Sequence, residues 1–432
     1  MTGFFRSTGW RRSTTAGGLY TSVALGLLGA VVAARELGKT EFGYFATVVA
    51  AAGLFESLLD LTVEESLTKF GFRYVAARDW GRLRRLFVVA TRFKAMGALL
   101  ALVALAALAP AADWLFGAED LTAPMLAVAF LPLVQTQEDV AATALILRGR
   151  YDLRGAFLAL SMGLRLAGIA IGAHYGVLEA VLGMIAAQAV ATAAVSVAGI
   201  AAFRRFPSEP ARPLAEDRAE IKRFVLRSSV ATGVLSLRTM FAPLLLGVVA
   251  GTTAVGFLRV AQAPQSGLTA ASSPVRLILL TEQTRDWELG REQVVLAGVR
   301  RYMVGAATLM VVVVPIFFWL MPTLVRVVFG HQYLPAVMAA RVILFAAALQ
   351  FVYGWSKSLP VSIGKPQLRI WAHGLETIVL LPLVVLLGWK WEVTGAAVAI
   401  LVSTAVFVGL WTVFLLRLRG EVADRASAAA AS

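Results

Sequence analysis

Cysteine is absent from the 432-residue chain, which excludes disulfides, thiol nucleophiles, zinc–thiolate sites and iron–sulfur clusters. Histidine is scarce as well, because His174, His331 and His373 stand far apart and no pair has the spacing of metal ligands. Charged residues make up only 15% of the sequence, whereas soluble globular proteins carry roughly 25%. The composition therefore excludes an ordinary water-soluble fold.

Hydrophobic residues make up 59% of the chain, and its mean hydropathy is +0.77. Apolar runs long enough to cross a bilayer, about 20 residues each, recur along the whole sequence. A backbone that crosses lipid must satisfy its own hydrogen bonds, and an α-helix does so. The sequence predicts an all-α polytopic membrane protein of about twelve spans. These spans cover residues 14–34, 43–63, 87–109, 122–147, 155–174, 177–203, 228–249, 254–281, 302–328, 336–356, 370–388 and 394–416.

Basic residues are distributed unevenly between the predicted loops. With a cytoplasmic N-terminus, 29 of the 40 Lys and Arg residues lie in cytoplasmic termini and loops, three lie on the opposite side and eight lie within spans. This asymmetry follows the positive-inside rule and predicts that both termini are cytoplasmic. It also accounts for the net charge of +14 without nucleic acid, since such residues face anionic lipid. No cleavable signal is evident, so we expect the first span to be retained.

The two halves of the chain resemble each other at two loops. Residues 38–44 (GKTEFGY) match 251–257 (GTTAVGF) at an offset of 213, and 149–154 match 364–369 at an offset of 215. Six spans per repeat predict two six-helix lobes related by a pseudo-two-fold axis along the membrane normal, with a site between them near the midplane. The predicted parts are an N-terminal lobe (1–206), a cytoplasmic linker with an amphipathic helix (207–227), a C-terminal lobe (228–420) and a disordered cytoplasmic tail (421–432).

Five short segments carry a resemblance to a known family. They are residues 33–45 (AARELGKTEFGYF), 59–70 (LDLTVEESLTKF), 254–257 (AVGF), 329–336 (FGHQYLPA) and 364–366 (GKP). In these loops, and in this order, the chain resembles the O-antigen (Wzx-type) flippases of the multidrug/oligosaccharidyl-lipid/polysaccharide exporter superfamily. Thr62 departs from the pattern, because the family usually has glycine there. The resemblance covers nearly the whole chain.

The resemblance implies a transporter rather than an enzyme, working in the bacterial cytoplasmic (inner) membrane. Its implied cargo is an undecaprenyl-diphosphate-linked oligosaccharide, which is flipped from the inner to the outer leaflet by alternating access. The end product is an O-antigen of lipopolysaccharide, a capsule or an exopolysaccharide. The implied partners are membrane lipids and other polysaccharide-assembly membrane proteins. The resemblance implies no cofactor. It does imply that transport is coupled to a proton or sodium gradient.

Two arginines are predicted near the bilayer midplane, one in each half. Arg165 and Arg238 stand about ten residues into their spans. An ionisable side chain there costs about 2.5–3.5 kcal/mol on insertion scales, so it faces a cavity or a partner. Guanidinium groups bind phosphate oxygens bidentately, which suits a diphosphate. With neighbouring polar positions, the candidate substrate-binding residues are Arg238, Arg165, Arg276, Ser236 and Thr269. The alternative is that these arginines pair with Glu138 or Glu376 between helices.

Carboxylates within the spans are the candidates for ion coupling. Glu56 and Asp60 are four residues apart and share one helix face. The full candidate set is Glu56, Asp60, Glu138, Asp139 and Glu376. Eight basic residues against these five acids leave a cationic surplus within the spans, which favours an anionic cargo. Arg92 and Lys94, near the inner end of span three, are expected to extend toward the membrane surface.

Three other functions compete with the flippase. A cation-coupled multidrug antiporter of the same superfamily predicts that acids dominate the cavity. A membrane-embedded polymerase or ligase needs a large external loop, whereas the longest one predicted here is about a dozen residues, around 110–121. A membrane scaffold requires no midplane arginine. We rank these functions in that order, behind the flippase.

Overall fold

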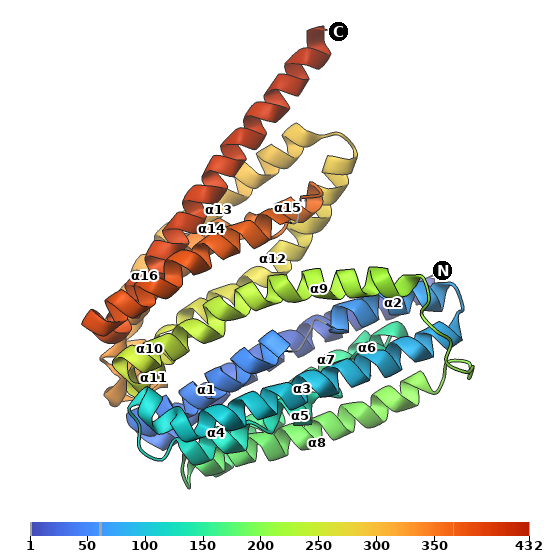
Figure 1. Cartoon of the computed structure of the whole chain (residues 1–432). Helices are drawn as coiled ribbons and strands as arrows, with labels where there is room; N and C mark the ends of the chain where they lie inside the picture. The colour runs from blue at the N-terminus through green and yellow to red at the C-terminus, as the bar shows by residue number, and fades with distance from the viewer. Residues whose placement is uncertain (1, 60–62, 366, 432) are drawn as a thin grey trace. The chain divides into compact units, whose positions relative to one another are not determined.

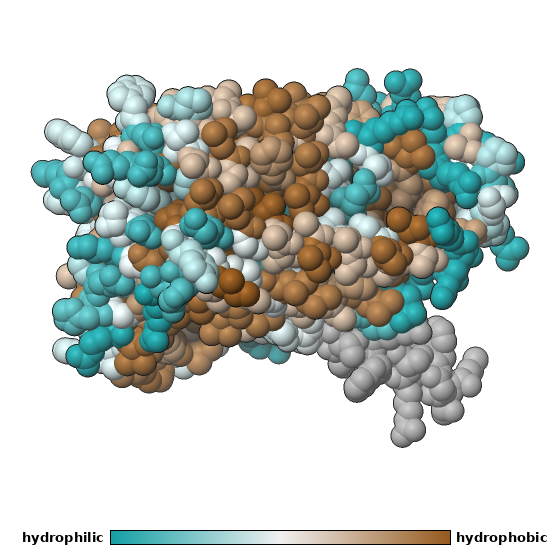
Figure 2. All heavy atoms as spheres, turned by 90° about the horizontal axis from the view of Figure 1, so that it is seen from below, coloured by the Kyte–Doolittle hydropathy of each residue, from teal (hydrophilic) through white to brown (hydrophobic). Residues whose placement is uncertain are grey.

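The computed structural model describes residues 2–59, 63–365 and 367–431 (Figure 1). Side chains are described over the same ranges except at residues 2–16, 227, 228, 231, 232, 235, 271, 273–278, 281 and 425–431. The described chain is almost entirely helical and contains no β-strand, which confirms the predicted fold class. In the face drawn in Figure 2, hydrophobic side chains form a band between hydrophilic zones, as spanning helices require.

The chain forms two compact units. The first unit contains residues Met1–Leu244 and Gly251–Gly256, and the second contains Leu245–Ala250 and Phe257–Ser432. The helices of the first unit are α1 (Thr2–Leu59), α2 (Val63–Ala76), α3 (Trp80–Phe116), α4 (Thr122–Val128), α5 (Leu131–Gln135), α6 (Glu138–Leu147), α7 (Tyr151–Ala173), α8 (Val177–Phe203), α9 (Asp217–Ser236) and η1 (Leu237–Phe241).

Helices α10 (Ala242–Ala250) and α11 (Thr252–Ala261) have residues in both units. The remaining helices of the second unit are α12 (Ala263–Glu288), α13 (Glu292–Val328), η2 (His331–Tyr333), α14 (Ala336–Val352), η3 (Gly354–Lys357), α15 (Leu359–Ser362) and α16 (Gln367–Ala431). The last helix includes residues 421–431, for which the sequence predicts a disordered tail. The predicted amphipathic helix at 216–227 forms the first turns of α9, which continues without a break to Ser236.

Two long helices each contain two predicted spans joined at a turn. α1 turns at Gly38, whose φ of 75° favours glycine, and α16 turns at Trp391 and Glu392. The structure repeats such positive-φ turns at the offsets seen in the sequence. The glycine pairs are Gly38 and Gly251, Gly117 and Gly330, and Gly149 and Gly364, which stand 213, 213 and 215 residues apart. The two halves of the chain therefore share one order of turns.

Span four, predicted as one helix, is divided into α4, α5 and α6. Pro132 lies in the first turn of α5 and has no N–H to donate to the preceding turn, so the α-helical ladder cannot continue through it. Broken helices are tolerated at membrane depth where their freed backbone groups are buried in protein or line a cavity. The breaks bring several polar side chains of this segment into the interior of the first unit.

Helices α7 and α8 pack unusually closely within the first unit. A Cβ at Gly168 would lie 2.2 Å from the carbonyl oxygen of Gly183, and the reciprocal distance is also 2.2 Å. Only glycine permits this approach, which is typical of helix packing in membranes. The contact fixes the register of the two helices that supply Arg165 and Gln188 to the site described next.

Candidate functional site

A group of polar side chains lies inside the first unit, and we call it the N-terminal polar cluster. It is built from α1, α3, α5, α6, α7 and α8. Its members are Glu56, Lys94, Gln135, Glu138, Asp139, Ser161, Arg165, Gln188 and Thr192. Polar groups at membrane depth are expensive unless they are partnered, so their concentration in one place makes this cluster the candidate functional site.

Glu138 and Gln188 form the centre of this cluster. Gln188 is fully buried, and its Nε2 donates to Glu138 Oε2 at 2.5 Å and to Thr192 Oγ1 at 3.1 Å. Its Oε1 accepts a hydrogen bond from Ser161 Oγ at 3.4 Å. Glu138 has no basic partner within 4.0 Å among the described residues, so its direct hydrogen-bond partner is a neutral amide.

Asp139, the neighbour of Glu138, has a different environment. Its carboxylate forms an ion pair with Lys94, whose side chain is 6% exposed. The expectation that Lys94 extends toward the membrane surface is therefore wrong, because an intramembrane carboxylate on α6 offers it a closer partner. Arg92, two residues earlier on α3, is exposed. The two adjacent acids of span four therefore differ in their direct partners. Asp139 pairs with the cationic Lys94, whereas Glu138 accepts a hydrogen bond from the neutral amide of Gln188.

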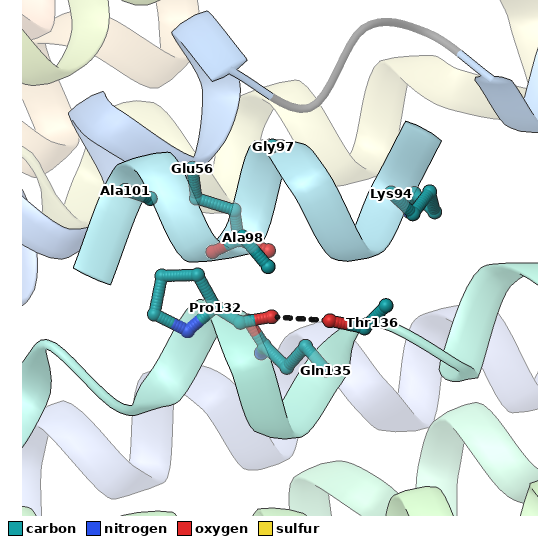
Figure 3. A pocket seen from close by; sticks show the side chains of 8 residues that line it. All are labelled: Glu56, Lys94, Gly97, Ala98, Ala101, Pro132, Gln135 and Thr136. Atoms are coloured by element: carbon teal, nitrogen blue, oxygen red, sulfur yellow. Dashed lines mark hydrogen bonds between the residues drawn. The ribbon is translucent and has the colours of Figure 1, made fainter. Parts of the chain in front are cut away.

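Glu56 faces a small cavity between α1, α3 and α5 (Figure 3). With its amide nitrogen turned toward Glu56, Gln135 donates to the two carboxylate oxygens at 2.8 and 3.1 Å. The cavity has a volume of about 20 Å³, enough for one water molecule or a small ion. It is lined by Glu56, Lys94, Gly97, Ala98, Ala101, Pro132, Gln135 and Thr136. Small residues on α3 leave this space open.

Arg165 lies on α7 beside the acids of the cluster. The carboxylates that interact electrostatically with its guanidinium are those of Glu56 and Glu138. Its Nη2 also approaches Met184 Sδ at 3.5 Å. The structure thus brings a substrate-binding candidate, Arg165, and a coupling candidate, Glu138, into one cluster, without an ion pair between them within 4.0 Å.

The other substrate-binding candidates lie on different elements. Ser236 is buried at the end of α9, and the half-buried Arg238 belongs to the π-helical segment η1, a type of distortion that is frequent at functional sites. Thr269 on α12 is exposed. The side chain of Arg276 and the whole of Asp60 lie outside the described residues.

Glu376, the coupling candidate of the second unit, is buried on α16. Its Oε2 lies 3.2 Å from His373 Nδ1, and the His373 ring stacks on Phe407 with centroids 5.2 Å apart. Glu376 stands 215 residues after Ser161, the offset that relates the turns flanking these helices. If the two halves are aligned at this offset, the carboxylate of Glu376 in the second half corresponds to the hydroxyl of Ser161 in the first half.

Gln188 is a member of the site that was not among the residues predicted from the sequence. A glutamine in the middle of an otherwise apolar span is a detectable signal, because an amide in lipid needs a partner. The identity of that partner depends on the packing of α6 against α8, which no local pattern shows. Within the described ranges, no group of three or more His, Asp or Glu residues could hold a metal ion.

Chemically, the N-terminal polar cluster can bind a proton or a monovalent cation. A carboxylate surrounded by amide and hydroxyl groups offers oxygen ligands for a hard cation, and it is neutralised by protonation. The nearby guanidinium of Arg165 can stabilise the ionised state. Gain or loss of one charge would therefore change the electrostatic balance among α1, α6 and α7.

Comparisons with known proteins give a family and a fold. The profile of the family described as "Polysaccharide biosynthesis protein" matches residues 12–275. A search of curated protein sequences gives no match. Solved structures of transporters are similar to this chain over nearly their full lengths, and two of them serve as examples. The lipid II flippase MurJ in an inward closed conformation has a TM-score of 0.72 at 12% identity, covering 95% of this chain and 90% of that one. An inward-facing multidrug resistance MATE family transporter of the MOP superfamily has a TM-score of 0.70 at 14% identity, covering 94% and 95%.

Proposed function

Because the chain belongs to the polysaccharide biosynthesis protein family, we propose that it flips an undecaprenyl-diphosphate-linked oligosaccharide across the bacterial cytoplasmic membrane for surface polysaccharide assembly. The family and the flippase-like and transporter-like fold support transport of a lipid-linked cargo. The observation that carries the proposal is the centre of the N-terminal polar cluster, where the half-buried carboxylate of Glu138 accepts a hydrogen bond from the fully buried amide of Gln188. A membrane scaffold would not require an intramembrane carboxylate of this kind.

Glu138 is the proposed ion-coupling residue of this transport. Its hydrogen-bond partner is neutral, so a proton or sodium ion can bind the carboxylate without displacing a salt bridge. Asp139 is less suited to this role, because it is already compensated by Lys94. Arg165 acts in the proposal as the fixed cation that responds to the charge on Glu138.

Arg238 is the proposed contact of the diphosphate. Its guanidinium can bind two phosphate oxygens at once, and it lies on a π-helical segment rather than a regular helix. Ser236 and Thr269 are proposed to supply hydroxyl groups to the same cargo, and Arg276 a further positive charge. Arg165 is proposed to contribute only if cargo binding draws it away from the carboxylates.

A multidrug antiporter is the second candidate function. It is favoured by the similarity to MATE family transporters and by the association of Arg165 with acids, which lowers the positive charge available to an anion. An antiporter would export cationic compounds, and its activity would depend on Glu56, Glu138 and Glu376 rather than on Arg238.

Deletion of the gene, followed by complementation with variants, tests these proposals. Loss of surface polysaccharide with accumulation of lipid-linked oligosaccharide in the inner leaflet supports the flippase. Normal polysaccharide with raised sensitivity to cationic dyes supports the antiporter instead. Arg238→Ala should abolish complementation, and Arg238→Lys should restore it in part, since a point charge replaces a bidentate group. Full complementation by Arg238→Ala contradicts the diphosphate contact.

A further inference from the structure

A second cavity lies in the second unit, between the start of α13 and the end of α16, and has a volume of about 460 Å³. Its lining combines three arginines with three apolar residues: Arg300, Arg301, Arg419, Leu296, Ala297 and Val304. This volume falls in the range of roughly 300–1,000 Å³ that is typical of small-molecule sites. The transport proposal uses none of these residues.

Helical periodicity explains how α13 forms one wall of this cavity. Ala297, Arg300 or Arg301, and Val304 follow one another at intervals of three or four residues, so they lie on one face. The opposite side of the helix is occupied by the core, because Val295 and Val299 pack there with residues of α15 and α16. The arginines are therefore held at an exposed face next to a rigid core.

The charges of the three arginines determine what this cavity can bind. None of them forms an ion pair with an Asp or Glu side chain within the part of the chain that the structure describes. Three like charges around one cavity repel each other unless an anion lies between them. Planar guanidinium groups match the oxygens of a phosphate, which makes phosphate the anion that this lining fits best.

The apolar surface beside the cavity indicates the rest of the ligand. Val304 and Val311 are seven residues apart on the same face of α13, and they are 59% and 73% exposed. Leu416, one turn before Arg419 on α16, is 59% exposed. The arginines thus stand at one end of a lipid-facing apolar strip, on the side that the positive-inside rule predicts to be cytoplasmic.

We propose that this cavity binds the phosphate headgroup of an anionic glycerophospholipid of the cytoplasmic leaflet, with an acyl chain along the strip of Val304, Val311 and Leu416. A basic pocket between membrane helices on the cytoplasmic side has the chemistry for such a headgroup. A lipid with two phosphates binds more tightly than a lipid with one, because it can contact arginines of both helices. This site is independent of the flippase proposal and binds lipid whatever the cargo.

Native mass spectrometry of the purified full-length protein tests the assignment, with diphosphatidylglycerol, phosphatidylglycerol and phosphatidylethanolamine as the added lipids. The triple variant R300Q/R301Q/R419Q should lose affinity for the two anionic lipids on the order of 100-fold, from about 1 kcal/mol per arginine. The matched control R223Q/R291Q/R417Q removes three exposed arginines outside the cavity lining and should keep the parent's affinity. R419Q alone provides a milder variant and should lose about fivefold, from the same contribution of about 1 kcal/mol per arginine.

Three results would overturn the assignment. An equal loss of lipid affinity in the matched control would mean that the basic surface attracts anionic lipids generally and that the cavity is not a specific binding site. Equal binding of phosphatidylethanolamine would mean that no anionic headgroup is recognised. Full displacement of the phospholipid by an equimolar polyprenyl diphosphate would assign the cavity to the cargo.

Discussion

Replacing Gln188 by leucine should destabilise the protein mainly through its effect on Glu138. The substitution removes the amide that donates to the Glu138 carboxylate at 2.5 Å and to Thr192 at 3.1 Å. A hydrogen bond to a charged group contributes about 1.5–3 kcal/mol, whereas polar pairs in membrane proteins average about 0.6 and reach about 1.7 kcal/mol. We expect Gln188→Leu to cost about 2 kcal/mol, most of it from the Glu138 pair.

A double-mutant cycle separates this pair from general packing effects. Glu138→Gln, Gln188→Leu and the double variant are compared by equilibrium unfolding of the full-length protein in mixed detergent micelles. The expected coupling energy between the two sites is about 1–2 kcal/mol. Gln350→Leu is the matched control, because within the described residues Gln350 bonds to Gln265 and Thr404, neither of which is a partner of Glu138.

If the costs of Glu138→Gln and Gln188→Leu add up within about 0.3 kcal/mol, the two side chains do not interact as described. The polar cluster would then contribute no cooperative stability, and the proposal that Glu138 is the ion-coupling residue would lose its structural support. Non-additivity in the Gln350→Leu control would show that the assay reports global loosening instead.

Two further predictions concern packing and pH. Gly168→Ala should destabilise the protein by about 1–3 kcal/mol, because the added Cβ would lie 2.2 Å from the Gly183 carbonyl oxygen. Gly298→Ala on α13 is the control, because its Cβ meets open space and should not destabilise the protein. Equal effects of the two substitutions on the unfolding midpoint would contradict the close approach of α7 and α8. Hydrogen bonding to the Arg73 guanidinium lowers the pKa of Glu220. The stabilisation is therefore present above the ordinary Glu pKa of about 4.3 and is lost as the pH falls through the lower folded-state value. The parent's unfolding temperature should fall more between pH 7 and pH 3.5 than that of Glu220→Gln, and identical slopes would show that the pair contributes nothing.

The helices could be predicted from the sequence because local pattern determines them in a membrane. Apolar runs of span length form helices, because a backbone in lipid must satisfy its own hydrogen bonds. Gly38 and Gly251 form turns, because glycine adopts positive φ without a steric cost. Both effects act over a few residues. The division of span four was foreseeable only in part. Pro132 predicts a kink, whereas the separation into three helices also depends on the neighbours that accept the freed backbone groups.

The candidate site could be predicted less completely, because it depends on which helices pack together. Glu138 and Arg165 are recognisable from the sequence as intramembrane charges, and their mutual association was one of two alternatives. The pairing of Lys94 with Asp139 and the role of Gln188 depend on contacts between residues about 45–50 positions apart. Such contacts follow from the packing of whole helices, so no motif shows them.

Reconstitution tests whether this protein moves lipid-linked oligosaccharide between leaflets, as we propose. The purified protein is placed in vesicles with a labelled undecaprenyl-diphosphate oligosaccharide, and the label in the outer leaflet is destroyed by a membrane-impermeant reagent. We expect the remaining label to become accessible faster than in protein-free vesicles, and we expect Glu138→Gln to remove any acceleration by an imposed proton or sodium gradient. The flippase proposal would be contradicted if the label became accessible no faster than in protein-free vesicles while the same protein still exchanged a cationic dye for protons.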